Sequence, residues 1–135
     1  MRIVGLDWGE ARIGVSVSDP LGITAQPLIS LENNGEFIGK LREIMEKYDA
    51  GEIVLGYPKQ MNGKAGISAA KVNEFREKIK GEFPVKITLW DERLTTKIAQ
   101  QSFVASGAPR KKRKGFIDAS AAGIILQSYL DSRKT

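Results

Sequence analysis

Apolar positions along the chain form two kinds of pattern, continuous β-type runs and stripes with the spacing of a helix. An apolar run at residues 3–6 leads into Asp7 and a glycine-containing turn, and a second β-type run ends at Val17. Two such runs joined by a short turn predict a β-hairpin. A third extended segment follows at residues 23–31. Pro27 within it predicts an edge strand, because proline cannot donate a hydrogen bond to a neighbouring strand.

The spacing then changes to that of a helix. Between residues 36 and 48 the apolar positions recur every three or four residues, which predicts an amphipathic helix over one face of a sheet. A continuous apolar run at 53–57, closed by Pro58, is typical of a strand buried on both faces. The later segments are predicted as a loop at 59–66, a helix at 68–80, a strand at 85–90, and helices at 95–106 and 116–132.

This order of elements predicts an α/β fold. The alternation of strand and helix after residue 36 favours parallel strands, and the opening hairpins add antiparallel ones. We therefore expect a mixed five-stranded sheet with helices on both faces and Asp7 on a central strand. No linker or repeat divides the sequence, so residues 1–135 are predicted to form a single domain.

The amino-acid composition limits the catalytic groups that the chain could use. The chain has 135 residues, of which 41% are hydrophobic and 27% charged, and it contains neither cysteine nor histidine. Disulfides and the commonest zinc ligands and general bases are thereby excluded. Catalysis would have to use carboxylates, lysines, hydroxyls or a metal ion bound by oxygen. No apolar run is long enough to span a membrane, and the chain opens on a strand instead of a signal peptide, so we expect a cytoplasmic protein.

Positive charge is concentrated in one segment. Lysine and arginine number 21 against 16 acidic residues, a net charge of +5, and five of the basic residues are consecutive at 110–114. Clustered basic residues favour a polyanionic partner, because they displace counterions from phosphates. A solvated loop with no partner explains the same run equally well.

Three carboxylates stand at the ends of predicted core elements: Asp7 on the first strand, Glu92 after the last strand, and Asp118 near the start of the last helix. If they converge, they form an all-oxygen site suited to Mg²⁺ or Mn²⁺. Each also has a structural explanation, since Asp7 could cap a turn, Glu92 could pair with Arg93, and Asp118 could interact with the helix dipole. Small residues at 119–123 favour a close approach of the last helix to the sheet, which would hold Asp118 near the other two.

Four motifs in this order resemble the YqgF family of RuvC-like Holliday junction resolvases and pre-16S rRNA nucleases. They span nearly the whole chain and are Gly5-Leu6-Asp7-Trp8-Gly9, Val54-Leu55-Gly56-Tyr57-Pro58, Trp90-Asp91-Glu92-Arg93-Leu94-Thr95-Thr96 and Ile117-Asp118-Ala119-Ser120-Ala121-Ala122. The resemblance implies a ribonuclease-H-like three-layer fold. It also implies a metal-dependent nuclease that hydrolyses phosphodiester bonds in 5′-end processing of pre-16S rRNA.

Carried over residue by residue, the resemblance makes Asp7, Glu92 and Asp118 the catalytic and metal-binding acids, with Mg²⁺ or Mn²⁺ as cofactor. In the chemistry it implies, two metal ions flank the scissile phosphate. Basic residues would then contact phosphates of structured RNA or branched DNA without reading sequence. The candidates are Arg12, Lys59, Arg93, Arg110, Lys111, Lys112, Arg113 and Lys114.

The sequence differs from the family pattern at one position, and alternative functions stay open. The pattern of RuvC-type resolvases has four carboxylates, two of them one helical turn apart in the last helix. In this chain Ala121, three residues after Asp118, stands in place of the second of these acids. This favours RNA processing over Holliday junction resolution. A non-catalytic nucleic-acid-binding module is a second alternative. The first motif also resembles a phosphate loop of the actin, Hsp70 and sugar-kinase fold, although that architecture needs two domains. The protein could be a monomer, or a homodimer if it acts on a symmetric junction.

Overall fold

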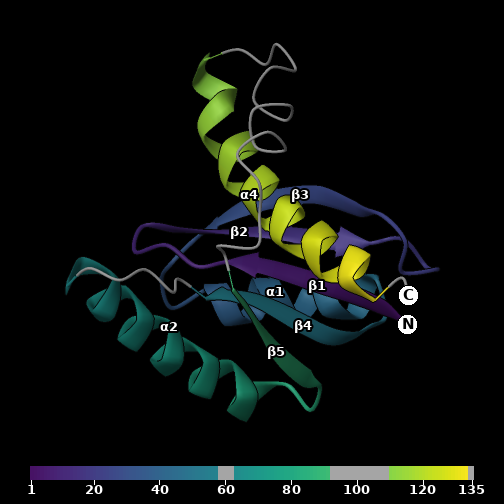
Figure 1. The fold of residues 1–135 in the computed structure, drawn as a ribbon, viewed down its shortest axis with the longest axis horizontal. Coiled ribbons are helices and arrows are strands. Elements are labelled where there is room, and N and C mark those ends of the chain that lie inside the picture. The colour runs from purple at the N-terminus through teal and green to yellow at the C-terminus, as the bar shows by residue number, and fades with distance from the viewer. Residues whose placement is uncertain (58–62, 92–109, 134–135) are drawn as a thin grey trace.

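The computed structural model describes residues 1–57, 63–91 and 110–133, with the backbone alone at 63–68 and 110–118. Five strands form one sheet in the order β3-β2-β1-β4-β5 (Figure 1). They are β1 (Arg2–Asp7), β2 (Arg12–Ser18), β3 (Ala25–Glu32), β4 (Ala50–Tyr57) and β5 (Lys86–Asp91). β1 pairs antiparallel with β2 and parallel with β4, which in turn pairs parallel with β5. The predicted mixed sheet is confirmed, with β1 at its centre.

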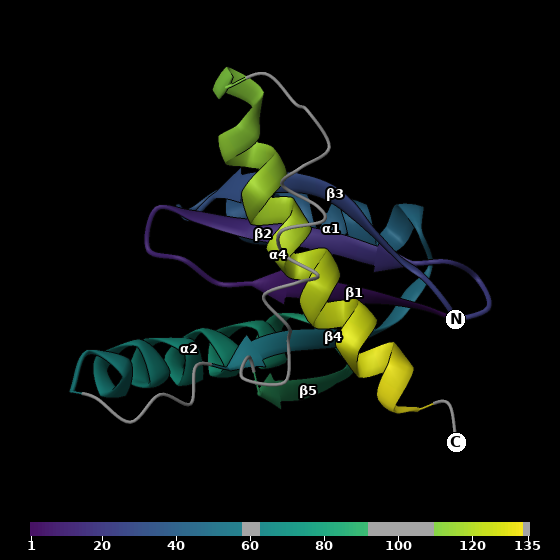
Figure 2. The same ribbon diagram turned by 45° about the horizontal axis from the view of Figure 1, so that its top comes forward.

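Helices cover both faces of this sheet (Figure 2). α1 (Phe37–Lys47) and α2 (Gly63–Glu82) pack on one face, and α4 (Arg110–Ser132) crosses the other, where it contacts β1, β2, β3 and β4. The residues of β1 alternate between the two layers: Val4 and Leu6 belong to the core beneath α1 and α2, whereas Ile3 packs with α4. Burial on both faces explains why β1 is almost entirely apolar.

The amphipathic stripes of α1 and α2 form one core with the sheet. Each helix buries a residue every three or four positions, the period of a helix face directed at a sheet. The buried residues are Phe37, Leu41, Met45, Val72, Phe75 and Ile79. The rings of Phe37 and Phe75 lie 5.6 Å apart between centroids, so the two helices also contact each other.

β3 is the edge strand that Pro27 predicts. Pro27 pairs with Ser16 of β2, and the register shifts between Val15 and Ser16 at the same place. A bulge at a proline interrupts the row of unpaired backbone groups on the outer side of β3, which protects this edge from pairing with another strand.

Two helix boundaries differ from the sequence prediction. α2 begins at Gly63 instead of 68, so residues 63–66 are helical and not part of a loop. α4 begins at Arg110 instead of 116, so the basic run lies in a helix and not in a loop. Lysine and arginine are good helix formers, and a glycine costs only about 1 kcal/mol relative to alanine, so Gly115 does not end α4. The helix predicted at 95–106 lies outside the described residues.

Candidate functional site

Three parallel strands finish at one end of the sheet, here called the carboxyl end, and their arrowheads point the same way in Figure 2. Asp7 is the last residue of β1, Tyr57 the last of β4 and Asp91 the last of β5. Tyr57 and Asp91 are direct partners in the ladder between β4 and β5. Glu92 follows Asp91 in the sequence and lies outside the described residues.

The face on which Asp7 lies follows from its neighbour Gly5. A Cβ atom at Gly5 would meet Ser16 Oγ at 2.5 Å, Leu126 Cβ at 2.8 Å and the Ala122 carbonyl oxygen at 3.1 Å. Gly5 therefore faces α4 at very close range. Because alternate residues of a strand share a face, Asp7 lies on the α4 side of the sheet, two residues closer to the carboxyl end.

α4 runs across the sheet so that its first half lies toward the carboxyl end. Leu130 and Arg133, near its C-terminus, line a cavity with Ile3 at the opposite end of β1. Ala122 lies over Gly5. The backbone of Asp118 is one helical turn before Ala122, about 6 Å along the helix axis, and so on the side of Ala122 nearer to the carboxyl end. The side chain of Asp118 lies outside the described residues.

Hydrogen bonds fix the position of α4 on the sheet. Ser16, fully buried on β2, donates from Oγ to the Ala122 carbonyl at 2.8 Å. Trp90 Nε1 donates to Ser128 Oγ at 3.0 Å, and the Tyr129 hydroxyl donates to Glu52 Oε2 at 2.6 Å.

Burial, and then the hydrogen bond to Glu52, raise the pKa of Tyr129. Sequence patterns did not predict these contacts, although a serine within the apolar run of β2 is a signal of a special contact.

The turn between β1 and β2 also lies at the carboxyl end. Asn33 Nδ2 donates to the Gly9 carbonyl at 2.7 Å, which ties this turn to the segment after β3. Lys71 Nζ of α2 pairs with the Glu10 carboxylate, and this pair lowers the pKa of Glu10. Asn73 Nδ2 donates to the Tyr57 hydroxyl at 3.3 Å. The middle of α2 is thereby anchored beside both β1 and β4. Neither Glu10 nor Lys71 was a candidate from the sequence.

The basic candidates have different placements. Arg12 opens β2 at the carboxyl end, where its ladder partner is Glu32. Residues 110–114 form the first turns of α4, and these turns project beyond the sheet in both ribbon views (Figures 1 and 2). Lys59 and Arg93 lie outside the described residues.

Within the described ranges no three acidic, histidine or cysteine side chains form a metal-binding group. Of the three predicted acids, Asp7 is the one whose side chain is described. The convergence of Asp7, Glu92 and Asp118 therefore stays a prediction. Likewise, none of the helices in the described part of the chain has the length and apolar character needed to cross a membrane.

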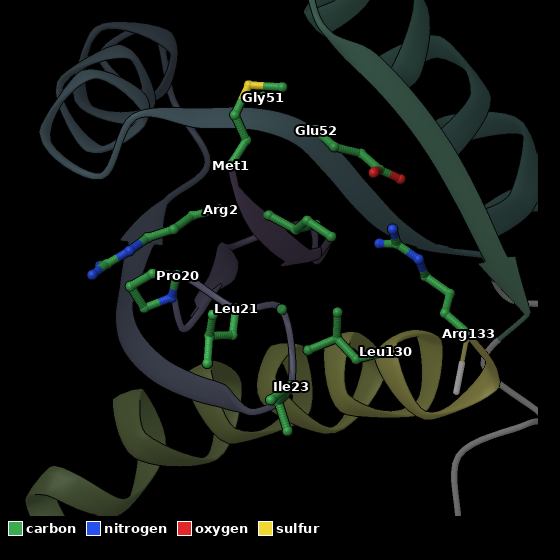
Figure 3. Close-up of a pocket in the computed structure, with 11 residues that line it drawn as sticks. Met1, Arg2, Pro20, Leu21, Ile23, Gly51, Glu52, Leu130 and Arg133 are labelled. Atoms are coloured by element: carbon green, nitrogen blue, oxygen red, sulfur yellow. The ribbon is translucent and has the colours of Figure 1, made fainter. Parts of the chain in front are cut away.

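A cavity of about 550 Å³ opens at the other end of the sheet, where β1 and β4 begin (Figure 3). Glu52 and Arg133 line it, together with Met1, Leu21 and Ile23, whose side chains are exposed. It lies at the opposite end of β1 from Asp7, so it is separate from the candidate site.

Comparison with known proteins matches the chain to the family model described as "RuvX: Holliday junction resolvase" over residues 1–132. The chain is 45% identical over 138 residues to the "Putative pre-16S rRNA nuclease" of Geobacillus sp. (strain WCH70), covering 99% of this chain and 100% of the relative. It is 48% identical over 134 residues to the protein of the same name from Clostridium acetobutylicum, covering 98% and 99%.

Two solved structures share the fold. Thermus thermophilus RuvC in complex with a Holliday junction substrate has a TM-score of 0.58 at 14% identity, covering 98% of this chain and 96% of that one. Fowlpox virus resolvase in complex with Holliday junction DNA has a TM-score of 0.54 at 12% identity, covering both chains fully (100%). The ribonuclease-H-like fold expected from the sequence is confirmed.

Proposed function

Since the chain belongs to the RuvX family, we propose that it is a divalent-metal-dependent nuclease that processes the 5′ end of pre-16S rRNA. The name shared by its close relatives supports the substrate. One structural observation carries the catalytic assignment. Asp7 ends the central strand on the face that α4 crosses, and the backbone of Asp118 lies on α4 in the direction of the same end of the sheet.

The third acid of the proposed site is Glu92. Thr88 and Trp90 of β5 make their hydrogen bonds on the α4 side, to Glu52 and Ser128. Glu92 is the next alternate residue of the sequence after Trp90, and alternate residues of a strand share a face. We propose that Asp7, Glu92 and Asp118 converge at the carboxyl end of the sheet on the α4 side.

This donor set fits a hard divalent cation. All three side chains offer carboxylate oxygens, the ligands that Mg²⁺ and Mn²⁺ prefer, and the chain has no histidine or cysteine to favour a softer metal. A bound metal would supply Lewis-acid stabilisation of the scissile phosphate and lower the pKa of the attacking water. Hydrolysis then joins the water oxygen to phosphorus and breaks the bond to the 3′ oxygen.

The chain's basic residues would hold the substrate. Arg12 starts β2 at the carboxyl end, close in sequence to Asp7, and the run at 110–114 extends from the same helix as Asp118. We propose phosphate contacts for these residues and for Lys59 and Arg93. Such contacts position a nucleic-acid backbone without reading its bases.

Holliday junction resolution is the second candidate, because the family description names it. Ala121 argues against junction resolution, since the pattern of RuvC-type resolvases has a second acid at that position of the last helix. A non-catalytic binding module is the third candidate, and it predicts binding without cleavage.

The test is cleavage of end-labelled precursor rRNA and of a four-way DNA junction with Mg²⁺ or Mn²⁺, comparing wild type with Asp7→Asn. We expect RNA cleavage by wild type and a loss of about 100-fold or more in Asp7→Asn, the order found when a group that stabilises the transition state is removed. Asp49→Asn is the matched control. Asp49 is exposed after α1 with a φ of 50°, a conformation that asparagine also tolerates.

Each outcome decides between the candidates. Cleavage of the junction without cleavage of RNA would replace rRNA processing by resolution. Salt-sensitive binding of both substrates without cleavage would replace the nuclease by a binding module. Undiminished cleavage by Asp7→Asn would remove Asp7 from the catalytic set.

A further inference from the structure

The ion pair between Glu10 and Lys71 lies at the boundary between the carboxyl end of the sheet and solvent. Glu10 comes three residues after Asp7, in the turn to β2, and its side chain is 72% exposed. Lys71 reaches it from α2 and is 43% exposed. Three residues span at most about 11 Å of extended chain, so the backbone of Glu10 lies within that distance of Asp7, the acid at which the proposed cleavage takes place.

Lys71 is held in this place by more than its ion pair. The next residue, Val72, is buried in the core, and Asn73 donates to the hydroxyl of Tyr57 at the end of β4. The backbone of α2 at Lys71 is therefore fixed by packing and by a separate hydrogen bond. Removal of Glu10 would leave the ammonium group at the same end of the sheet.

Both side chains of the pair are exposed, which places it among the weak ion pairs. Ion pairs between exposed side chains contribute little and are screened by salt. A nucleic-acid backbone carries closely spaced phosphates, and each lysine that binds one releases a counterion. Glu10, in contrast, carries a negative charge that repels a phosphate, and its hydrogen bond and charge interaction with Lys71 lower its pKa.

We propose that Glu10 acts as an internal competitor for the nucleic-acid backbone. Its carboxylate occupies the Lys71 ammonium in the unliganded protein and releases it to a substrate phosphate when RNA or DNA binds. Lys71 is thus a positioning residue for the substrate, and Glu10 limits affinity. This inference rests on the proposed function, since it assumes a nucleic acid at the carboxyl end of the sheet.

Binding in the absence of cleavage tests the proposal. A short fluorescein-labelled single-stranded RNA and a labelled four-way DNA junction are titrated with the full chain by fluorescence anisotropy, at several salt concentrations, with EDTA present to prevent metal-dependent cleavage. The variants are Glu10→Gln, Lys71→Met and the double variant. Matched controls are Glu77→Gln and Lys78→Met, which make the same charge changes at exposed positions of α2 further from the carboxyl end.

We expect Glu10→Gln to tighten binding about two- to fivefold relative to Glu77→Gln, the scale set by an exposed ion pair. Lys71→Met should weaken binding more than Lys78→Met. It should also reduce the slope of log affinity against log salt by about 0.7 for single-stranded RNA, as expected for one lost phosphate contact. In a chain that already carries Lys71→Met, Glu10→Gln should tighten binding no more than Glu77→Gln does. That coupling distinguishes exchange at Lys71 from a general effect of net charge.

Two results would overturn the inference: equal affinities of Glu10→Gln and Glu77→Gln, or an unchanged advantage of Glu10→Gln without Lys71. Its failure is distinguishable from failure of the proposed function. If wild type binds neither probe and cleaves neither substrate, the nuclease proposal fails first. If wild type binds and cleaves but the Glu10 and Lys71 variants behave as their controls, the exchange alone is wrong. Thermal unfolding of each variant verifies that it is folded.

Discussion

Gly5 of β1 lies directly beneath Leu126 of α4: a Cβ atom on Gly5 would come within 2.8 Å of Leu126 Cβ. Real Cβ atoms do not approach other atoms so closely, so the separation of α4 from the sheet depends on the absence of a side chain at this position. Because Asp118 belongs to α4 and Asp7 follows Gly5 by two residues on β1, the same contact positions the backbone of α4 relative to the strand that ends in Asp7.

Gly5→Ala is expected to destabilise the protein and to impair cleavage. The added methyl group must displace α4 or β2, and overpacking of a core costs about 1–3 kcal/mol. Urea unfolding measures the stability. Cleavage assays without urea, at a temperature well below the melting transition, measure the activity. We expect activity to fall by more than the folded fraction explains, because α4 shifts relative to Asp7.

Gly39→Ala is the matched control for that substitution. Gly39 lies within α1, and apart from its chain neighbours and the backbone of the adjacent turns of α1, no atom lies within 4 Å of a Cβ placed there. Alanine is favoured over glycine inside a helix by about 1 kcal/mol, so this variant should be more stable than wild type and equally active. A destabilised Gly39→Ala would contradict the assignment of α1 as an unstrained helix.

Ser16→Ala should lower stability by about 1 kcal/mol, because the buried Oγ donates to the Ala122 carbonyl and its loss leaves that contact unmade. Ser132→Ala is the comparison: its hydroxyl donates to the Tyr129 carbonyl in the exposed last turn of α4. Chemical denaturation of both variants checks the difference. Equal losses in the two would mean that the contact between Ser16 and α4 contributes nothing special.

Tyr129 links stability to high pH. Burial and the hydrogen bond to Glu52 raise its pKa above the ordinary value of 10.0. The neutral phenol is therefore favoured in the folded state, so its contribution is complete below pH 10 and is lost as the pH rises through the raised pKa. Tyr129→Phe should remove this part of the alkaline loss, seen as a flatter dependence of the denaturation midpoint on pH. Spectrophotometric titration of the phenol gives the shift directly, and a Tyr129 that ionises at its ordinary pKa would contradict it.

Asp19 links stability to low pH. Its carboxylate accepts hydrogen bonds from the backbone N–H groups of Thr24 and Ile23, and these bonds lower its pKa below the ordinary 3.8. The ionised form is favoured in the folded state, so the contribution is present above pH 3.8 and is lost as the pH falls through the lowered pKa. Asp19→Ala should therefore be less stable than wild type at neutral pH, and the difference should shrink in acid. A difference that stays constant with pH would contradict this origin.

The sequence by itself determined the elements whose signals are local. Two β-type runs joined by a glycine-containing turn predicted the opening hairpin, the helical period predicted the buried stripe of α1, and Pro27 predicted the edge strand. Asp7 could be placed at the end of β1 because a carboxylate closes an apolar run. These features depend on residues that are neighbours in the chain, so a pattern read along the sequence contains them.

Only the tertiary structure decided what depends on distant pairs. Glu10 and Lys71 are 61 residues apart, and Ser16 and Ala122 are 106 apart. No local period records which of many lysines meets which acid, or how closely α4 lies on β1. The starts of α2 and α4 also differ from the prediction, because glycine's modest local cost does not stop a helix whose later turns pack on the sheet.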